Sequence, residues 1–90
     1  MTYGCGYLSF GQAIEALKAG KRVRRLGWNG KGMFLVYVAG TPGVLPREGS
    51  PYASLADINP HIDMKTANDT VVPWLASQSD MLGTDWEIVV

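Results

Sequence analysis

The chain has 90 residues and a mass of 9.8 kDa, enough for one small domain and too little for a second core. Apolar residues make up 47% and charged residues 18%, a composition typical of a globular protein. Eight basic residues balance eight acidic ones, which argues against a general polyanion binder, and no apolar run approaches the ~20 residues that span a bilayer. With no signal-peptide pattern at the start, we expect a soluble cytoplasmic protein with one domain over residues 1–90.

The N-terminal part of the sequence predicts a helix. Ser9 and Gln12 form an S-x-x-Q capping box, in which each side chain satisfies a backbone N–H of the first turn. Apolar residues then recur at helical spacing, namely Phe10, Ala13, Ile14 and Leu17. Gly20 supplies a C-terminal stop. We therefore expect a short amphipathic helix over residues 10–19, packed on a sheet.

The middle of the chain predicts a hairpin and a long loop. Residues 21–26 and 33–38 flank a glycine-rich turn with an Asn-Gly pair, which is a strong hairpin signal. Segment 33–38 is apolar on both faces, so we expect a central, well-covered strand. Residues 40–60 hold four of the five prolines and are expected to form a long ordered loop.

The last third predicts short strands around tight turns. Residues 61–65 and 70–72 flank a hairpin turn at 66–69, and residues 86–90 form a final strand. Between them, residues 74–82 are either a short helix or irregular. The expected fold is α+β, a small antiparallel sheet with one N-terminal helix packed on it.

The balanced net charge hides an uneven distribution. Residues 18–31 contain six basic residues and no acid, whereas residues 57–90 contain six acids and one lysine. A concentrated basic patch suits phosphate, and Arg25 offers bidentate geometry. The alternative is a solvated strand face paired with the acidic half of the molecule or of a neighbour. A short patch on a neutral chain fits a small phosphorylated ligand better than a duplex.

Two tryptophans stand beside polar residues in a way that suits a nucleobase. Trp28 precedes Asn29, and Trp74 precedes a polar segment. That segment contains Ser77, Gln78, Asp80 and Met81. An indole face can stack on a base while the polar groups bind its edge or the ribose. Two such clusters, in one chain or across an interface, could sandwich a base. The alternative is that each ring belongs to the core. Nine aromatic residues in so small a chain also suggest an interface or pocket.

The sequence argues against an enzyme and against a cofactor. His61 and Asp63 share a strand face and could form a dyad, but the single His and lone Cys5 leave too few ligands for a metal. Ser77 and Ser79 lack a G-x-S-x-G elbow, and no P-loop pattern is present. An enzyme that uses His61 and Asp63 remains the alternative.

Four sequence blocks carry a resemblance to a known family. They are F-x-x-A-I-x-A-L-K-x-G from residue 10, V-x-R-x-G-W-N-G-K-G-M from residue 23, P-H-I-D-M-K-T from residue 60 and V-P-W-x-A-S-x-x-D-M-L-x-x-D-W from residue 72. In this combination the chain closely resembles the small phage-encoded Thoeris anti-defence 2 family. The match leaves out residues 1–8 and 40–58.

The resemblance implies a non-enzymatic sponge, a protein that holds a signalling molecule without altering it. The signal is glycocyclic ADP-ribose, made by bacterial TIR-domain immune proteins, and the setting is the cytoplasm of the infected host. The family forms homotetramers with pockets at subunit interfaces, and no DNA or membrane partner is implied. Trp28, Asn29 and Trp74 resemble the ring and amide contacts to the messenger. Further pocket candidates are Arg25, Ser77, Gln78, Asp80 and Met81.

Three alternatives remain open beside this reading. Some family members hold cyclic dinucleotides of the CBASS system in a separate pocket, so such a ligand could bind instead or in addition. An enzyme could degrade the messenger through His61 and Asp63. A protein-binding module could block an immune protein directly through the basic strand, indifferent to nucleotide.

Overall fold

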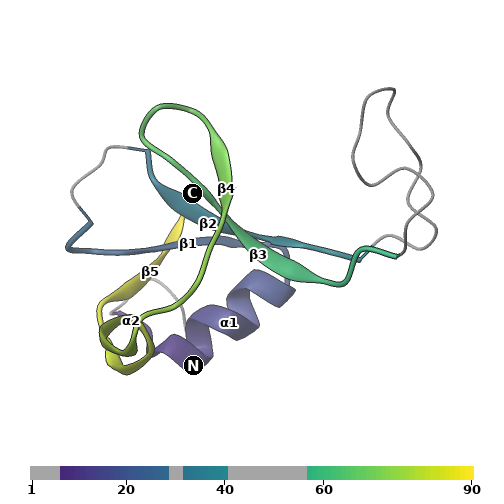
Figure 1. Ribbon diagram of the computed structural model, residues 1–90. Coiled ribbons are helices and arrows are strands. Elements are labelled where there is room, and N and C mark those ends of the chain that lie inside the picture. The colour runs from purple at the N-terminus through teal and green to yellow at the C-terminus, as the bar shows by residue number, and fades with distance from the viewer. Residues whose placement is uncertain (1–6, 29–31, 41–56) are drawn as a thin grey trace.

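The computed structural model describes residues 7–28, 32–40 and 57–90. The elements in chain order are α1 (Phe10–Lys18), β1 (Arg22–Arg25), β2 (Phe34–Val38), β3 (His61–Lys65), β4 (Val71–Pro73), α2 (Gln78–Leu82) and β5 (Trp86–Val89). The predicted α+β fold is confirmed: one helix lies against an antiparallel sheet, and a second short helix lies beside the N-terminal end of the first (Figure 1).

The sheet has five strands in the order β4-β3-β2-β1-β5, and each neighbouring pair is antiparallel. β2 is the central strand, as its apolar sequence predicts. Val23 of β1 pairs with Leu35 on one side and with Ile88 on the other, and these side chains therefore share one face. Leu8 adds an isolated bridge to Trp86, which ties the segment before α1 to β5.

The capping box at the start of α1 is present. The Gln12 backbone N–H donates to Ser9 Oγ at 3.2 Å, and the Ser9 N–H donates to Gln12 Oε1 at 2.9 Å. After the helix, Gly20 has φ of 90°, a left-handed conformation that glycine adopts without strain. Ala13, Ala16 and Leu17 form the buried stripe of α1. The helix thus ends one residue before the predicted end, and the chain then turns into β1.

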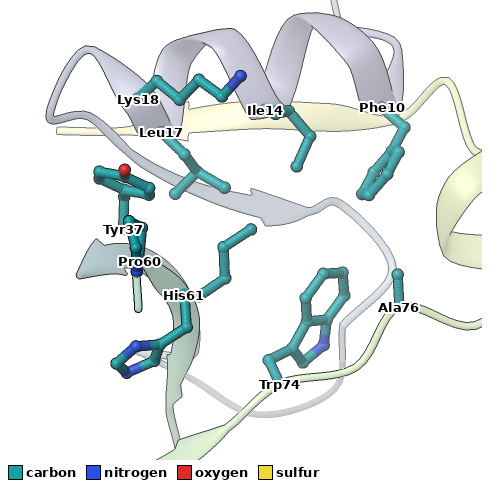
Figure 2. Close-up of a pocket in the computed structure, with 10 residues that line it drawn as sticks. Phe10, Ile14, Leu17, Lys18, Tyr37, Pro60, His61, Trp74 and Ala76 are labelled. Carbon is teal, nitrogen blue, oxygen red and sulfur yellow. The ribbon is translucent and has the colours of Figure 1, made fainter. Parts of the chain in front are cut away.

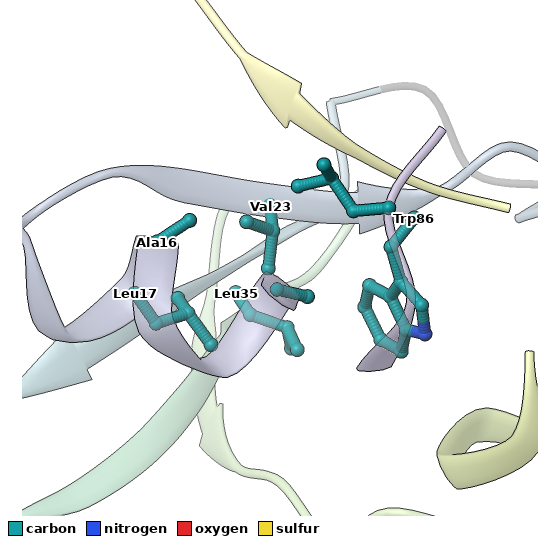
Figure 3. Close-up of a cluster of buried hydrophobic side chains, with 7 residues drawn as sticks. Ala16, Leu17, Val23, Leu35 and Trp86 are labelled. Atoms are coloured by element: carbon teal, nitrogen blue, oxygen red, sulfur yellow. The ribbon is translucent and has the colours of Figure 1, made fainter. Parts of the chain in front are cut away.

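The core lies between α1 and the half of the sheet formed by β1, β2 and β5 (Figure 3). Its fully buried side chains include Leu17, Val23, Leu35 and Trp86. Ile62 and Met64 of β3 pack against this cluster but are only partly buried. The helix therefore covers one end of the sheet more completely than the end that carries β3 and β4.

The β3–β4 turn is confirmed at residues 66–69. The Thr66 N–H donates to the Thr70 carbonyl at 2.8 Å, and Asp69 has φ of 62°, which aspartate tolerates in a turn. The strand after it is Val71–Pro73, one residue later than predicted. The antiparallel pairing of β1 with β2 agrees with the predicted hairpin, but its turn residues 29–31 and the loop residues 41–56 lie outside the described residues.

Candidate functional site

Two of the predicted ligand-binding rings belong to one aromatic cluster around the start of β5. Trp28 and Trp74 have ring centroids 6.5 Å apart, and each also contacts the buried Trp86 edge-on, at 5.6 and 6.0 Å. Phe10 of α1 closes the cluster at 6.3 Å from Trp74. Trp86 is fully buried, whereas Trp28 and Trp74 are half-buried. The two predicted rings therefore lie at the edge of the core with part of their surface exposed.

The geometry rules out a base held between these two rings in one chain. A sandwiched base needs parallel rings about 7 Å apart, which is two van der Waals separations of about 3.5 Å. Trp28 and Trp74 are instead inclined at 58° and touch each other across the cluster. They form a continuous aromatic wall. A base could stack on the outside of this wall, and a second covering group would have to come from elsewhere.

Arg25 is engaged by two carboxylates. Its Nε donates to Asp85 Oδ1 at 2.9 Å and its Nη1 donates to Asp80 Oδ1 at 3.1 Å. Its side chain is 22% exposed, and the pKa of Arg25 is raised first by the hydrogen bond to Asp85 and then by the one to Asp80. These bonds join β1 to α2 and to the turn before β5. The structure therefore gives Arg25 a bracing role beside the aromatic wall.

Asp80 of the short helix α2 forms hydrogen bonds with Ser77, Arg25 and Trp86. Its Oδ2 accepts from the Ser77 N–H at 2.9 Å, and its own N–H donates to Ser77 Oγ at 3.1 Å, a second capping box. The indole N–H of Trp86 donates to the backbone carbonyl oxygen of Asp80 at 3.0 Å. Burial opposes ionisation of Asp80, but the Ser77 hydrogen bonds and then Arg25 outweigh it and hold its pKa below the ordinary value. The carboxylate is thus fixed by the fold.

The remaining predicted residues lie on the surface of α2 or outside the described part. Ser77 and Gln78 are exposed, and Met81 is 46% exposed. Ser77 Oγ lies 3.0 Å from Ser79 Oγ. Asn29 falls outside the described residues. The structure therefore gathers Arg25, Trp28, Trp74 and Asp80 around Trp86 and leaves three polar or flexible side chains exposed nearby.

An apolar groove of about 330 Å³ lies between α1 and β3 (Figure 2). Its lining is Phe10, Ile14, Leu17, Lys18, Tyr37, Pro60, His61, Ile62, Trp74 and Ala76. Trp74 is the one predicted binding residue among them. Apart from His61 of the predicted dyad, the other lining residues do not stand out as binding residues in the sequence, because helical spacing assigns Phe10, Ile14 and Leu17 to a core stripe. Nothing in that spacing shows that the sheet continues past the helix.

His61 and Asp63 share the face of β3 that points away from α1. His61 Nε2 lies 3.3 Å from Asp63 Oδ2, and Nδ1 lies 3.0 Å from the Asn59 carbonyl oxygen. The pKa of His61 is raised, first by the Asn59 carbonyl and also by the charge of Asp63. Figure 2 shows the imidazole pointing away from Ile14 and Leu17. The dyad predicted from the spacing exists, and although His61 is among the residues that line the groove, its imidazole points away from the α1 side chains (Figure 2).

Two negative findings concern the part of the chain that the structure describes. Within residues 7–28, 32–40 and 57–90, no three His, Cys, Asp or Glu side chains gather as a metal site would require. No helix in these ranges is long and apolar enough to cross a bilayer.

Comparisons with known proteins agree on one family. Residues 8–89 match the family model of the Thoeris anti-defense 2-like domain. The chain is also 39% identical over 85 residues to the Thoeris anti-defense 2 protein of Bacillus phage SP01, and this alignment covers 91% of the chain and 94% of the phage protein.

Proposed function

The chain belongs to the Thoeris anti-defense 2-like family, and from this we propose that it is a phage protein that blocks Thoeris immunity by sequestering its messenger. The ligand is glycocyclic ADP-ribose, held without degradation in the cytoplasm of the infected host. The observation that carries the proposal is the half-buried wall of Trp28 and Trp74 in a chain that matches the family over residues 8–89.

The wall suits the base of such a messenger. An indole ring has a π-face on which a base can stack, worth ~1–3 kcal/mol per base. Trp86 packs edge-on against both rings and supports the wall from the core. Sequestration requires tight and slowly released binding and no chemical step.

The wall also supports the proposal that the protein works as a homo-oligomer, a tetramer in this family. Among residues 7–28, 32–40 and 57–90, the Trp28–Trp74 wall offers a base a stacking surface on one side, and a second copy could cover the other side. Leu75, three residues before α2, and Leu82, its last residue, are 92% and 79% exposed. Exposed apolar side chains of this size beside a binding wall are typical of an interface, and a second copy would bury them.

The alternatives predict different ligands or products. A messenger-degrading enzyme would use His61 and Asp63, which lie 3.3 Å apart. A sponge for CBASS cyclic dinucleotides would bind those ligands in a separate pocket, in place of glycocyclic ADP-ribose or in addition to it. A module that blocks an immune protein directly would bind protein and ignore nucleotide.

Titration of glycocyclic ADP-ribose into the protein, followed by tryptophan fluorescence, tests the proposed site. We expect Trp28→Ala and Trp74→Ala each to weaken binding by ~1–3 kcal/mol, about fivefold to 150-fold, because each removes a stacking face. Tyr7→Ala is the matched control, because Tyr7 is 55% exposed and is predicted to contribute no ring to the wall. Wild-type affinity in both folded tryptophan variants would refute the site.

A further inference from the structure

Trp86 is the fully buried ring of the aromatic cluster, and the proposed function gives it no task beyond support of the wall. We propose that Trp86 is a positioning residue for ligand binding. It fixes the directions in which Trp28 and Trp74 present their rings, and the hydrogen bond from its indole N–H to the Asp80 carbonyl fixes its own orientation. This inference rests on the proposed function for the wall as the messenger site, and it adds a residue that lies out of reach of the ligand.

The backbone of Trp86 is held on both sides of β5. Its N–H donates to the Leu8 carbonyl at 3.2 Å, and its carbonyl accepts from the Leu8 N–H at 2.7 Å. On the other side, Trp86 is paired with Arg25 of β1. A strand residue with a partner on each side has little freedom to shift. The point from which the indole side chain starts is therefore fixed by the sheet.

A single polar atom fixes the orientation of the indole ring. Nε1–H donates to the Asp80 carbonyl at 3.0 Å, and Figure 3 shows this nitrogen on the side of the ring that faces the short helix. The indole N–H is the one hydrogen-bonding group of a tryptophan side chain, and it can only donate. A flipped ring would turn the N–H away from this carbonyl and leave a buried donor unsatisfied, which is costly. The hydrogen bond thus selects one orientation of a ring that is otherwise surrounded by apolar groups.

Trp86 also touches the other rings of the cluster. Its ring centroid lies 5.6 Å from that of Phe10, 5.6 Å from that of Trp28 and 6.0 Å from that of Trp74. The two wall rings meet it at 77° and 85°, which is the edge-to-face arrangement that aromatic pairs prefer. Because protein interiors are close-packed, a turn of Trp86 would displace both wall rings. The directions of the wall rings therefore depend on the orientation of Trp86.

The carbonyl that accepts this hydrogen bond is itself held in place. Arg25 of β1 donates to the Asp80 carboxylate at 3.1 Å, and Ser77 exchanges two hydrogen bonds with Asp80 at 2.9 and 3.1 Å. A series of contacts thus runs from the sheet through Asp80 to Trp86 and on to the wall. The bonds that hold α2 to the sheet also set the angle of the wall.

Hydrogen exchange in the wild-type protein tests the first part of the inference without any substitution. We expect the indole N–H of Trp86 to exchange with solvent more slowly than the indole N–H groups of Trp28 and Trp74, as followed by NMR. Exchange of the Trp86 N–H as fast as that of the wall rings would contradict a fixed hydrogen bond and overturn the inference.

Replacement of Trp86 by benzothienylalanine tests the second part. This amino acid has the shape of tryptophan with sulfur in place of the N–H, so it keeps the ring and removes the hydrogen bond. We expect it to shift the indole NMR signals of Trp28 and Trp74 without ligand present, and to weaken binding of glycocyclic ADP-ribose at least about fivefold. Trp86→Phe, which also lacks the N–H and has a smaller ring, should have at least as large an effect.

Val23→Ala is the control that separates positioning from stability. Val23 is fully buried in β1, where its partners in the neighbouring strands are Leu35 and Ile88. Its truncation should destabilise the fold through a cavity. We expect it to leave the wall signals and the messenger affinity unchanged at a temperature where all variants are folded. A Trp86 that served the core alone would make the two kinds of variant behave alike.

The outcomes separate this inference from the proposed function. Unchanged messenger affinity in the benzothienylalanine variant would overturn the positioning role and leave the sponge intact. Equal losses of affinity in that variant and in Val23→Ala would show a general effect of stability and would also overturn it. Shifted wall signals in a protein whose wild type does not retain the messenger would support the control of the wall by Trp86 and refute the sponge.

Discussion

Arg25 and Asp80 are 55 residues apart in the sequence, and their side chains meet at 3.1 Å between Nη1 and Oδ1. Asp85 binds the same guanidinium at 2.9 Å, so one arginine holds both ends of the segment that contains α2. Gly83 lies directly under this contact, where an added Cβ would approach the guanidinium to 3.0 Å. α2 is thus fixed to the sheet by charge, and the aromatic wall lies beside it.

Arg25→Ala should lower the free energy of unfolding by ~1–3 kcal/mol, because it leaves two partly buried carboxylates without their shared partner. The matched control is Arg24→Ala in the same strand. Arg24 pairs with Glu87 at 2.9 Å in a more exposed place, so this substitution should lower the free energy of unfolding by at most ~1 kcal/mol. Urea unfolding measures both. Equal losses would contradict the bracing role of Arg25.

The two capping boxes allow a test of whether α2 belongs to the binding site. Ser9→Ala and Ser77→Ala each remove a cap and should each cost ~0.5–2 kcal/mol of stability. Ser77 starts α2, whose Asp80 contacts Arg25 and Trp86, whereas Ser9 starts α1, whose Phe10 contacts Trp74. We therefore expect both cap variants to weaken messenger binding, and we use Thr66→Ala, which removes a hydrogen bond in the β3–β4 turn, as the control that leaves it unchanged, as measured by titration on the folded variants. Equal affinities of Ser77→Ala and Thr66→Ala would place α2 outside the site.

Lowering the pH should reduce the stability of the fold around α2, because Asp80 becomes protonated. Because the folded pKa of Asp80 is lowered from its ordinary value near 3.8, its contribution to stability is full above that value and is lost as pH falls through the folded pKa. Urea unfolding between about pH 6 and pH 3 should show this loss in the wild type and a smaller one in Asp80→Asn. Asp69→Asn is the control, since Asp69 is 81% exposed beside Lys65 and its lowered pKa should matter less. If the free energy of unfolding of Asp80→Asn fell between pH 6 and pH 3 as much as that of the wild type, the result would contradict this account.

The pKa of His61 should lie above its ordinary value of 6.5. Its two ring nitrogens face the Asn59 carbonyl and the Asp63 carboxylate, and both groups favour the charged ring. The stability that this adds is present below pH 6.5 and is lost as pH rises through the folded pKa. The Cε1–H chemical shift followed by NMR measures the pKa directly. Asp63→Asn should lower it, and a His61 pKa at or below 6.5 in the wild type would refute the arrangement.

Much of the fold follows from local sequence. The capping box at Ser9 and the apolar spacing after it predict α1 to within one residue of its end, because both signals act over a single turn. The turn at residues 66–69 is predicted for the same reason. Segment 74–82 stays ambiguous in the sequence, since its helix has only five residues and depends on Arg25 from a distant strand.

The candidate site is less predictable than the fold. Trp28 and Trp74 stand out in the sequence because each is next to polar residues, but the spacing cannot show that they touch each other and Trp86. Arg25 is suited to phosphate by its chemistry, and only the fold reveals that Asp80 and Asp85 already bind it. The groove depends on where α1 ends relative to β3, which is a tertiary relationship that residue periodicity does not contain.

The most direct test of the account is capture and release of the messenger. The protein is incubated with glycocyclic ADP-ribose, free nucleotide is removed by filtration, and the retained fraction is released by heat and identified by mass. The account predicts that intact messenger returns in proportion to the protein and that its amount does not fall with incubation time. Altered messenger would contradict sequestration and favour an enzyme at His61 and Asp63, and no retained messenger would contradict the proposed ligand.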